Sequence, residues 1–341
     1  MMVNRNQKIL SNILQEEKLY HDGQIRQQLL KPNGRYEIIN LKSLAKGNFL
    51  NCIIELILLK NLKHENIFNK KNLNILSDSF DIGVDAGCDE QIFPLKDILI
   101  HTKFEPRQIK YLMFQLFSLV NYFHFNGLVA RSINPGHLMI SVDLNAYFID
   151  FSSMRLQDFP NNNSKDYRMD LNYSAPEISL NHNANIYESD IWSLGCILFE
   201  LAEAKPLFRV NNSSDYLRSI FKCLGSPEES NDLAFIKNNG TKKWIRAQSP
   251  SVTRNGSDWV SDIEADSELL DLMNKCLKFD PRERISAQKA LEHPYFNELY
   301  DPCEERAVLT KDLGHLNFYD VFQEDKNQND VIGILVNELR K

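Results

Sequence analysis

The sequence lacks the features that mark secreted, membrane-spanning or zinc-binding proteins. Its six cysteines are scattered along 341 residues, without a closely spaced pair of the kind that binds zinc or forms a redox motif. No run approaches the roughly 18 consecutive apolar residues of a transmembrane helix. The charged N-terminal stretch also lacks the apolar run of a signal peptide. These absences predict a soluble cytoplasmic or nuclear protein with reduced thiols.

An excess of basic charge is absent as well. The chain has 39 lysines and arginines against 46 aspartates and glutamates, which gives a net charge of −7. Proteins that bind nucleic acid usually carry a basic stripe, so we expect neither nucleic acid nor a membrane among the partners. A hydrophobic content of 43% over this length predicts about two core-forming domains or lobes.

What the sequence does contain is a change of character near residue 105. Before it, a short β-like run, YEIINL (36–41), precedes one helical pattern, NCIIELILLKNL (51–62). After it, apolar residues recur mainly at helical spacing. The expected helices cover residues 107–127, 187–205, 267–279, 286–296 and 329–341. The pattern predicts a small β-rich N-terminal part and a larger helical C-terminal part.

A series of short motifs runs through the C-terminal part in a fixed order. ARSINPGH (130–137) is followed by FIDFS, YSAPEI, SDIWSLGCILFEL and FDPRERISAQKALEHPYF. In this order and spacing they resemble the C-lobe of protein kinases. Five residues separate Ser132 from His137 and eighteen separate it from Asp150, as in the kinase catalytic loop and its metal-binding aspartate. The resemblance implies an α+β bilobal protein-kinase fold with a small β-rich N-lobe, a larger helical C-lobe and a C-terminal extension.

Within that superfamily the chain resembles a degenerate mitogen-activated protein kinase of the CMGC group. Residues 205–250 look like the insert of these kinases, and residues 293–307 look like the start of their C-terminal extension. The resemblance implies four segments. They are an N-terminal segment (1–17), a kinase-like N-lobe (18–92), a kinase-like C-lobe (93–296) and a C-terminal extension (297–341) that packs back on the lobes.

The resemblance also implies regulatory and docking residues. Counting back from YSAPEI places the family's activation pair on Lys165 and Tyr167, so the tyrosine is kept and the threonine is not. Tyr167 would accept phosphate from an upstream dual-specificity kinase, with Arg131 as a cationic partner; the alternative is an unmodified exposed tyrosine. An acidic patch would bind docking peptides of other signalling proteins, the alternative being a solvated charged turn. The patch residues are Asp301, Glu304 and Glu305.

The catalytic positions of this family are degenerate in the sequence. Ser132 stands where a kinase has the aspartate that accepts the substrate proton, Asn134 replaces a lysine, and His137 replaces a metal-binding asparagine. A hydroxyl has no useful basicity near neutral pH, and Asn134 brings no charge to the transferred phosphate. Imidazole is a poor ligand for Mg²⁺. The sequence therefore predicts that no catalytic residue of the loop is intact.

Nucleotide-binding features are also weakened. The glycine-rich loop of kinases maps onto KLYHDGQI (18–25), which keeps only one glycine, so backbone amides cannot approach a pyrophosphate closely. Lys42 and Glu55 are the candidate nucleotide-binding pair. Lys46 is the fallback for Lys42, and a solvated strand lysine is the other alternative. Asp150 is the candidate metal ligand, although Ser152 replaces the glycine of the motif. The resemblance thus implies ATP with Mg²⁺ as the ligand, held weakly or not at all.

Residues that hold the kinase frame are kept. Glu177 and Arg284 match a buried ion pair, and Asp190 and Trp192 match positions that brace the catalytic loop. The structural residues are kept while the catalytic residues are replaced. This combination predicts a pseudokinase that acts as a scaffold or allosteric partner in an intracellular signalling pathway. One alternative is a weakly active serine/threonine kinase that transfers phosphate from ATP, with Asp143 or a rearranged loop supplying the base. A second alternative is a nucleotide-free structural subunit.

Overall fold

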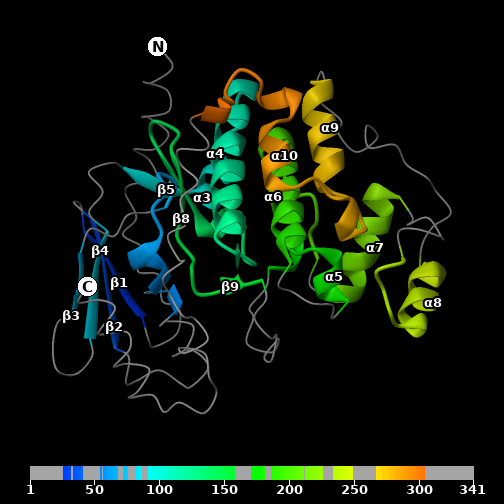
Figure 1. Cartoon of the computed structure of the whole chain (residues 1–341), viewed down its shortest axis with the longest axis horizontal. Helices are drawn as coiled ribbons and strands as arrows, with labels where there is room; N and C mark the ends of the chain where they lie inside the picture. The colour runs from blue at the N-terminus through cyan, green and yellow to red at the C-terminus, as the bar shows by residue number, and fades with distance from the viewer. Residues whose placement is uncertain are drawn as a thin grey trace. The chain divides into compact units, whose positions relative to one another are not determined.

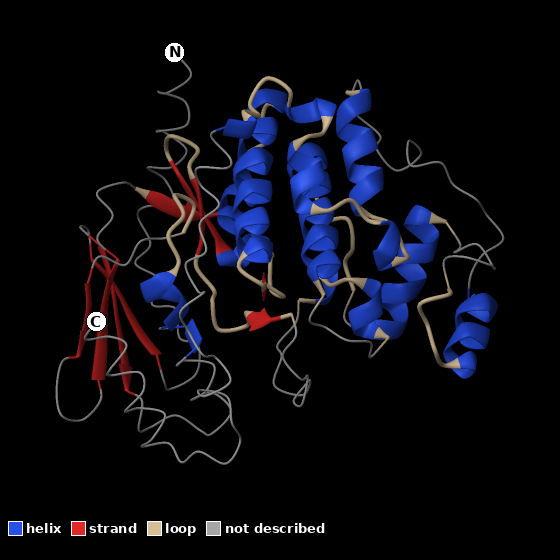
Figure 2. Ribbon diagram, in the orientation of Figure 1, coloured by secondary structure: helices blue, strands red, loops and turns tan. Residues whose placement is uncertain are grey.

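The computed structural model describes most of the chain between Arg26 and Cys303 (Figures 1 and 2). The described residues are 26–31, 34–40, 54–55, 57–67, 72–75, 81–86, 91–157, 170–180, 186–210, 212–225, 233–248 and 266–303. They divide into two compact units. The first holds the described residues up to Phe93 together with Met139–Met154, and the second holds Pro94–Leu138 together with the described residues from Arg155 onward.

Several predicted features lie outside the described residues. They are the N-terminal segment, the expected helix at 329–341 and most of the C-terminal extension, together with Lys42, Tyr167, Glu304 and Glu305. The proposed roles of these four residues and the predicted segment boundaries therefore stay predictions.

The first unit contains a four-stranded antiparallel sheet, in which the β-like run at 36–41 supplies most of one strand. The strands are β1 (Arg26–Lys31), β2 (Gly34–Asn40), β3 (Asn72–Ile75) and β4 (Asp81–Ala86). Their order in the sheet is β1-β2-β4-β3. Lys31 in β1 pairs with Gly34 in β2, and Tyr36 in β2 pairs with Asp85 in β4.

A second, three-stranded sheet contains the strand that directly follows the motif at 130–137. Its strands are β5 (Ile92–Pro94), β7 (Leu138–Ser141) and β8 (Ala146–Phe148), in the order β5-β7-β8. Residues 64–67 hold on to β8: the Phe148 amide donates to the Asn66 carbonyl at 3.0 Å, and Asn66 Nδ2 donates to the Ala146 carbonyl at 2.9 Å. All four residues of β7 are buried, as expected of an apolar run covered on both faces.

His64, a buried histidine two residues before Asn66, should make the stability of the first unit depend on pH. Burial lowers the pKa of His64 to about 4 from an unfolded value of 6.5, so between these values only the unfolded chain binds the extra proton. The stability conferred by neutral His64 is complete above pH 6.5 and is lost as the pH falls toward 4. We expect the free energy of unfolding to be about 2 kcal/mol lower at about pH 5 than at about pH 7.5 from this group alone.

Urea unfolding across this pH range would measure the effect. The control is His64→Asn, whose amide gains no proton and whose oxygen can still accept the Asn66 N–H that His64 Nδ1 accepts at 3.1 Å. Its pH dependence should be shallower than that of the wild type. Equal slopes for the two proteins would contradict the assignment.

The second unit is helical and is built around two buried helices, α4 (Pro106–Phe125) and α6 (Tyr187–Glu203). The start of α4 is fixed by a capping box between Glu105 and Gln108 with a proline at the first helical position. Its end is fixed by Gly127, whose φ of +77° favours glycine. No helix in the described part of the chain is long and apolar enough to cross a membrane.

Shorter elements complete the second unit. The helices are α3 (Leu95–His101), α5 (Pro176–Ser179), α7 (Ser213–Leu224), α8 (Asn239–Gln248), α9 (Ser267–Cys276) and α10 (Ala287–Leu291). The strands are β6 (Leu128–Val129) and β9 (Arg155–Leu156), which pair with each other. Short 3₁₀ turns are η2 (Pro135–His137), η4 (Leu171–Tyr173), η6 (Pro281–Glu283) and η7 (Pro294–Phe296).

The contact between α6 and the end of α9 depends on a glycine. A methyl group added at Gly195 would lie 2.9 Å from Cys276 Cβ and from two side-chain carbons of Leu277. We therefore expect Gly195→Ala to destabilise the fold by about 1–3 kcal/mol through overpacking, measured by urea unfolding. Gly240→Ala in α8 is the control, because its added methyl meets only the exposed Asn238 side chain. Equal stabilities of the two variants would contradict this account.

Candidate functional site

The loop between β6 and β7 contains the degenerate catalytic motif, and α6 holds its backbone in place. Asp190, in the first turn of α6 and 1% exposed, accepts the amide of Ala130 and the amide of Arg131, both at 2.8 Å. Arg131 has a φ of +67°, a backbone conformation that costs free energy in a non-glycine residue. The two hydrogen bonds to Asp190 thus fix an unfavourable turn at the position next to Ser132.

A histidine that the sequence analysis did not single out joins this anchor. His124, near the end of α4, places Nε2 3.0 Å from Asp190 Oδ2 and stacks on Tyr187 with ring centroids 4.4 Å apart. A histidine close to a helix end and just ahead of the loop was the signal available in the sequence. Trp192, the other expected brace, donates to Tyr216 Oη at 3.1 Å and stacks on Phe208.

The three degenerate catalytic positions are brought together, and they bond to one another. Asn134 Nδ2 donates to the Ser132 carbonyl at 3.0 Å, and Asn134 Oδ1 accepts the Gly136 amide at 2.8 Å. His137 Nδ1 lies 2.8 Å from the same Ser132 carbonyl. The same Nδ1 also lies 3.1 Å from Asn134 Nδ2. The loop therefore uses the side chains of Asn134 and His137 to hold its own 3₁₀ turn.

A polar cavity of about 360 Å³ lies beside this loop within the second unit. Its lining residues are Lys96, Asn134, Pro135, Gly136, His137, Asp170 and Tyr173. Asp170 supplies the carboxylate among them. Its Oδ1 accepts from the Asn172 amide at 3.0 Å and from Asn172 Nδ2 at 3.1 Å, while Oδ2 has no hydrogen-bond partner among the described residues. The sequence analysis missed Asp170, which ends an irregular polar stretch without periodicity.

One residue that lines the cavity, the buried Tyr173, is held in place by a hydrogen bond to α6. Tyr173 donates from Oη to Glu200 Oε2 at 2.5 Å, and Glu200 lies on α6. Burial, and then the adjacent Glu200 carboxylate, raise the pKa of Tyr173 well above its usual range. Burial also raises the pKa of Glu200. Tyr173 therefore stays protonated and serves as a hydrogen-bond donor that ties η4 to α6.

The candidate metal ligand Asp150 lies in the first unit and has local partners. Its Oδ1 accepts from the Ser152 hydroxyl at 2.6 Å and from the Ser152 amide at 3.1 Å. The serine that replaces the motif's glycine is thus a direct partner of the carboxylate. Phe151 is fully buried and meets Phe148 edge to face at 5.3 Å. Glu55 is also buried in this unit, at 2% exposed.

Active protein kinases bind ATP with Mg²⁺ held by an aspartate and an asparagine. Here Asp150 offers a carboxylate that already accepts two local hydrogen bonds. The asparagine position is His137, whose ring Nδ1 is bonded within the loop. Since Mg²⁺ prefers oxygen ligands in octahedral geometry, the His137 imidazole is a poor ligand for it, and Asp150 taken by itself offers one carboxylate.

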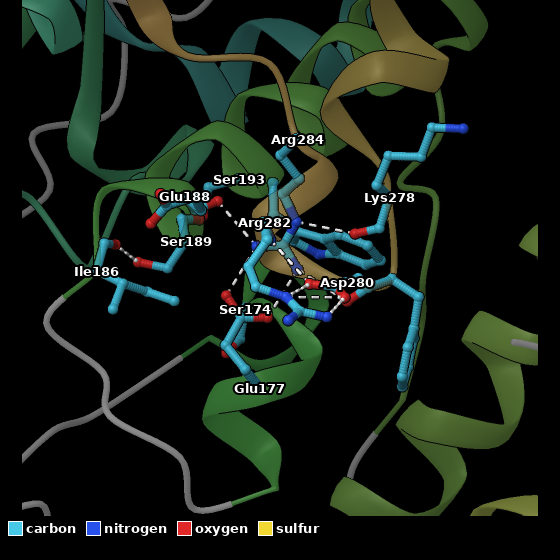
Figure 3. Close-up of polar contacts among 12 residues, drawn as sticks. Ser174, Glu177, Ile186, Glu188, Ser189, Ser193, Lys278, Asp280, Arg282 and Arg284 are labelled. Atoms are coloured by element: carbon cyan, nitrogen blue, oxygen red, sulfur yellow. Dashed lines mark hydrogen bonds and ion pairs between the residues drawn. The ribbon is translucent and has the colours of Figure 1, made fainter. Parts of the chain in front are cut away.

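The buried ion pair of the frame is present, and its arginine has a full set of partners (Figure 3). Arg284 donates to both carboxylate oxygens of Glu177 at 2.7 Å, and the two side chains are 0% and 1% exposed. The other guanidinium N–H groups donate to three backbone carbonyls. These belong to Glu188, Lys278 and Phe279. All five donors of the arginine are therefore used.

Only one residue of the expected acidic docking patch is described. Asp301 is exposed, and its Oδ1 accepts the Cys303 amide at 2.7 Å. This is a local turn contact of the kind that aspartate commonly makes. It leaves the docking role of Asp301 a prediction.

Comparison with known proteins identifies the family. The protein kinase domain model matches residues 35–296. The mitogen-activated protein kinase HOG1 of Exserohilum turcicum is 32% identical over 254 residues, which cover 74% of each chain. HOG1 of Candida albicans is 32% identical over 260 residues, which cover 75% of this chain and 67% of the relative. These matches confirm the predicted bilobal kinase fold, and the chain belongs to the protein kinase family, with similarity to its mitogen-activated members.

Proposed function

We propose that this protein is a pseudokinase that acts as a scaffold or allosteric partner in an intracellular signalling pathway. The observation that carries the proposal is the hydrogen-bond network inside the loop. Ser132 occupies the position of the catalytic base, and the side chains of Asn134 and His137 bond to the Ser132 carbonyl. Because these side chains form hydrogen bonds within their own loop, they are poorly placed to bind or polarise a phosphate group.

The magnitudes favour loss of activity. A positioned general base contributes about 10²- to 10⁴-fold to a rate, and Ser132 cannot supply it. Removing one preorganised electrostatic partner of a transition state costs a further factor of about 10²–10³, and Asn134 carries no charge in place of the lysine. The two losses together reach roughly four to seven orders of magnitude. Transfer by this loop would then be slower than transfer by an active kinase by about the same factor.

The proposed partners are other signalling proteins, because the relatives are mitogen-activated protein kinases. Asp301 belongs to the acidic patch that would take docking peptides, and Tyr167 would accept a phosphate from an upstream kinase. We propose a cytoplasmic or nuclear location and no direct binding of nucleic acid or membrane. A Tyr167→Phe protein that keeps the same partner affinity as its phosphorylated parent would remove the switch from this proposal.

A phosphate-transfer assay tests the proposal directly. The wild type and Asp150→Ala are incubated with ATP, Mg²⁺ or Mn²⁺ and a generic serine/threonine substrate, with an active family member as the positive control. We expect the wild type to transfer no more phosphate than Asp150→Ala. Transfer by the wild type that Asp150→Ala abolishes would overturn the pseudokinase assignment.

The second candidate function is a weakly active serine/threonine kinase, and the position of Asp170 favours it. This carboxylate lines the cavity that Asn134 and His137 also line, and its Oδ2 is available as a proton acceptor. Asp143, the base considered from the sequence, lies exposed on the turn after β7 and does not line the cavity. If transfer is detected, its loss in Asp170→Asn but not in Asp143→Asn would establish this candidate.

The third candidate, a nucleotide-free structural subunit, is separated from the others by thermal denaturation with ATP and Mg²⁺. A ligand at about 100 times its dissociation constant stabilises the native state by about 2.7 kcal/mol, which raises a melting temperature by several degrees. The pair of local bonds on Asp150 favours a small shift or none. A shift that Asp150→Ala abolishes would instead indicate a nucleotide-dependent scaffold.

A further inference from the structure

The helix α8 and the residues just before it carry a concentration of positive charge. Residues 233–248 contain four basic residues and no acidic one, in a chain whose net charge is −7. The basic residues are Lys237, Lys242, Lys243 and Arg246. Figure 1 shows α8 at the edge of the second unit opposite to α4. The local charge is therefore opposite in sign to that of the chain as a whole.

Three of these residues form one stripe along the helix. At about 100° per residue, Lys242, Lys243 and Arg246 fall within an arc of roughly 100°. Lys243 and Arg246 are exposed and Lys242 is half-buried. Ile245 is 0% exposed, so the helix is anchored through a different face. We call Lys242, Lys243 and Arg246 the α8 stripe.

Among the residues that the structure describes, the α8 stripe has no acidic partner, unlike basic residues on neighbouring helices. Arg218 on α7 pairs with Asp215, and Lys275 on α9 pairs with Asp271. Within the described ranges, no residue of the stripe takes part in an ion pair, and neither does Lys237. The amides at the start of α8 are capped by the chain itself, because Asn238 Oδ1 accepts from Gly240 and Thr241. The charge available for binding thus comes from the side chains.

We propose that the α8 stripe is a docking surface for an acidic, carboxylate-rich segment of a partner protein. Three cations within about one and a half turns match a few closely spaced carboxylates by charge complementarity. With a Debye length of about 8 Å at physiological salt, a short segment lying on α8 senses this local field and is largely screened from the acidic remainder of the chain. The surface lies outside the loop chemistry, so it goes beyond the proposed function and does not depend on whether phosphate is transferred.

Size and geometry argue against other polyanions. Strong electrostatic binding of nucleic acid draws on roughly six to ten phosphate contacts, more than this stripe offers. A helix that lies on a membrane buries its apolar face in the lipid, whereas Ile245 of α8 is already packed inside the protein. Both ligands also present extended negative surfaces, which the net negative charge of the chain would repel.

The test uses the full chain and a fluorescein-labelled oligoglutamate peptide, with binding followed by fluorescence anisotropy at low and physiological salt. The triple variant Lys242→Gln, Lys243→Gln, Arg246→Gln should weaken binding roughly tenfold or more, because three charge contacts are lost. Glutamine is a good helix former, so α8 is expected to remain folded. The wild-type affinity should fall as salt rises.

A matched variant controls for net charge. Replacing Lys222, Lys278 and Lys289 by glutamine removes the same charge from exposed positions outside α8, and it should retain near-wild-type affinity. An equal loss in both triple variants would overturn the proposal, as would no binding of the peptide by the wild type. Tighter binding of a short oligonucleotide, or of phosphatidylserine-containing vesicles, than of the peptide would also overturn it.

Discussion

Arg284→Ala is expected to lower the free energy of unfolding by about 3–5 kcal/mol, because it leaves a buried carboxylate without its partner. Glu177 is 1% exposed, and both of its oxygens accept from Arg284 at 2.7 Å. The substitution also removes the donors to the carbonyls of Glu188, Lys278 and Phe279. The cost comes from stranding these groups in a site that water does not reach.

Equilibrium urea unfolding would measure the effect, and the neighbouring Arg282 provides a matched control. Arg282 also pairs with a buried aspartate, Asp280, but its own side chain is 60% exposed. Water reaches the pair from that side and can replace the lost guanidinium, so Arg282→Ala should cost clearly less than Arg284→Ala. If both variants lost a similar free energy of unfolding, burial of the arginine would not be the cause of the large effect at Arg284.

This comparison bears on function as well as on stability. The Glu177–Arg284 pair links α5, which contains Glu177, to the end of the 3₁₀ turn η6 that follows α9. A chain that retains such a pair needs a fixed shape in this region. A fixed shape serves a binding surface as well as it serves an active site, so the presence of the pair is consistent with the proposed scaffold role.

The elements that could be predicted from the sequence are those with strong local signals or fixed motif spacing. Apolar periodicity predicts a helix over residues 107–127, and α4 spans Pro106–Phe125. Glu177 and Arg284 could be paired although they are 107 residues apart, because each lies in a recognisable kinase motif. Motif order thus carried long-range information that periodicity does not contain.

The parts that could not be predicted depend on geometry within loops. The network of Ser132, Asn134 and His137 requires the 3₁₀ turn at 135–137, and the residue types alone do not specify which atoms meet. Asp170 reaches the cavity from an irregular polar stretch, where neither helical nor strand periodicity indicates a direction. The α8 stripe was missed for another reason: a short basic run is ordinary in sequence, and only the structure shows that no described acidic residue pairs with it.

Asp190→Ala is expected to destabilise the protein by about 3–5 kcal/mol, because two buried amides lose their acceptor and each orphaned group costs about 1–3 kcal/mol. These amides belong to Ala130 and Arg131. The positive φ of Arg131 adds to the effect. Without the hydrogen bond that holds it, this residue would relax toward a more favourable conformation and displace the loop at Ser132.

Two further variants separate the hydrogen bonds from the charge. Glu188→Ala removes the other acidic residue from the first turn of α6, so it loses the same favourable interaction with the helix dipole, about 0.3–1 kcal/mol, and none of the loop contacts. Asp190→Asn keeps the shape but has one acceptor oxygen, so it should fall between Glu188→Ala and Asp190→Ala in urea unfolding. If Asp190→Ala were no less stable than Glu188→Ala, the loop would not depend on this anchor, and its turn would have to be held by the Asn134 and His137 bonds alone.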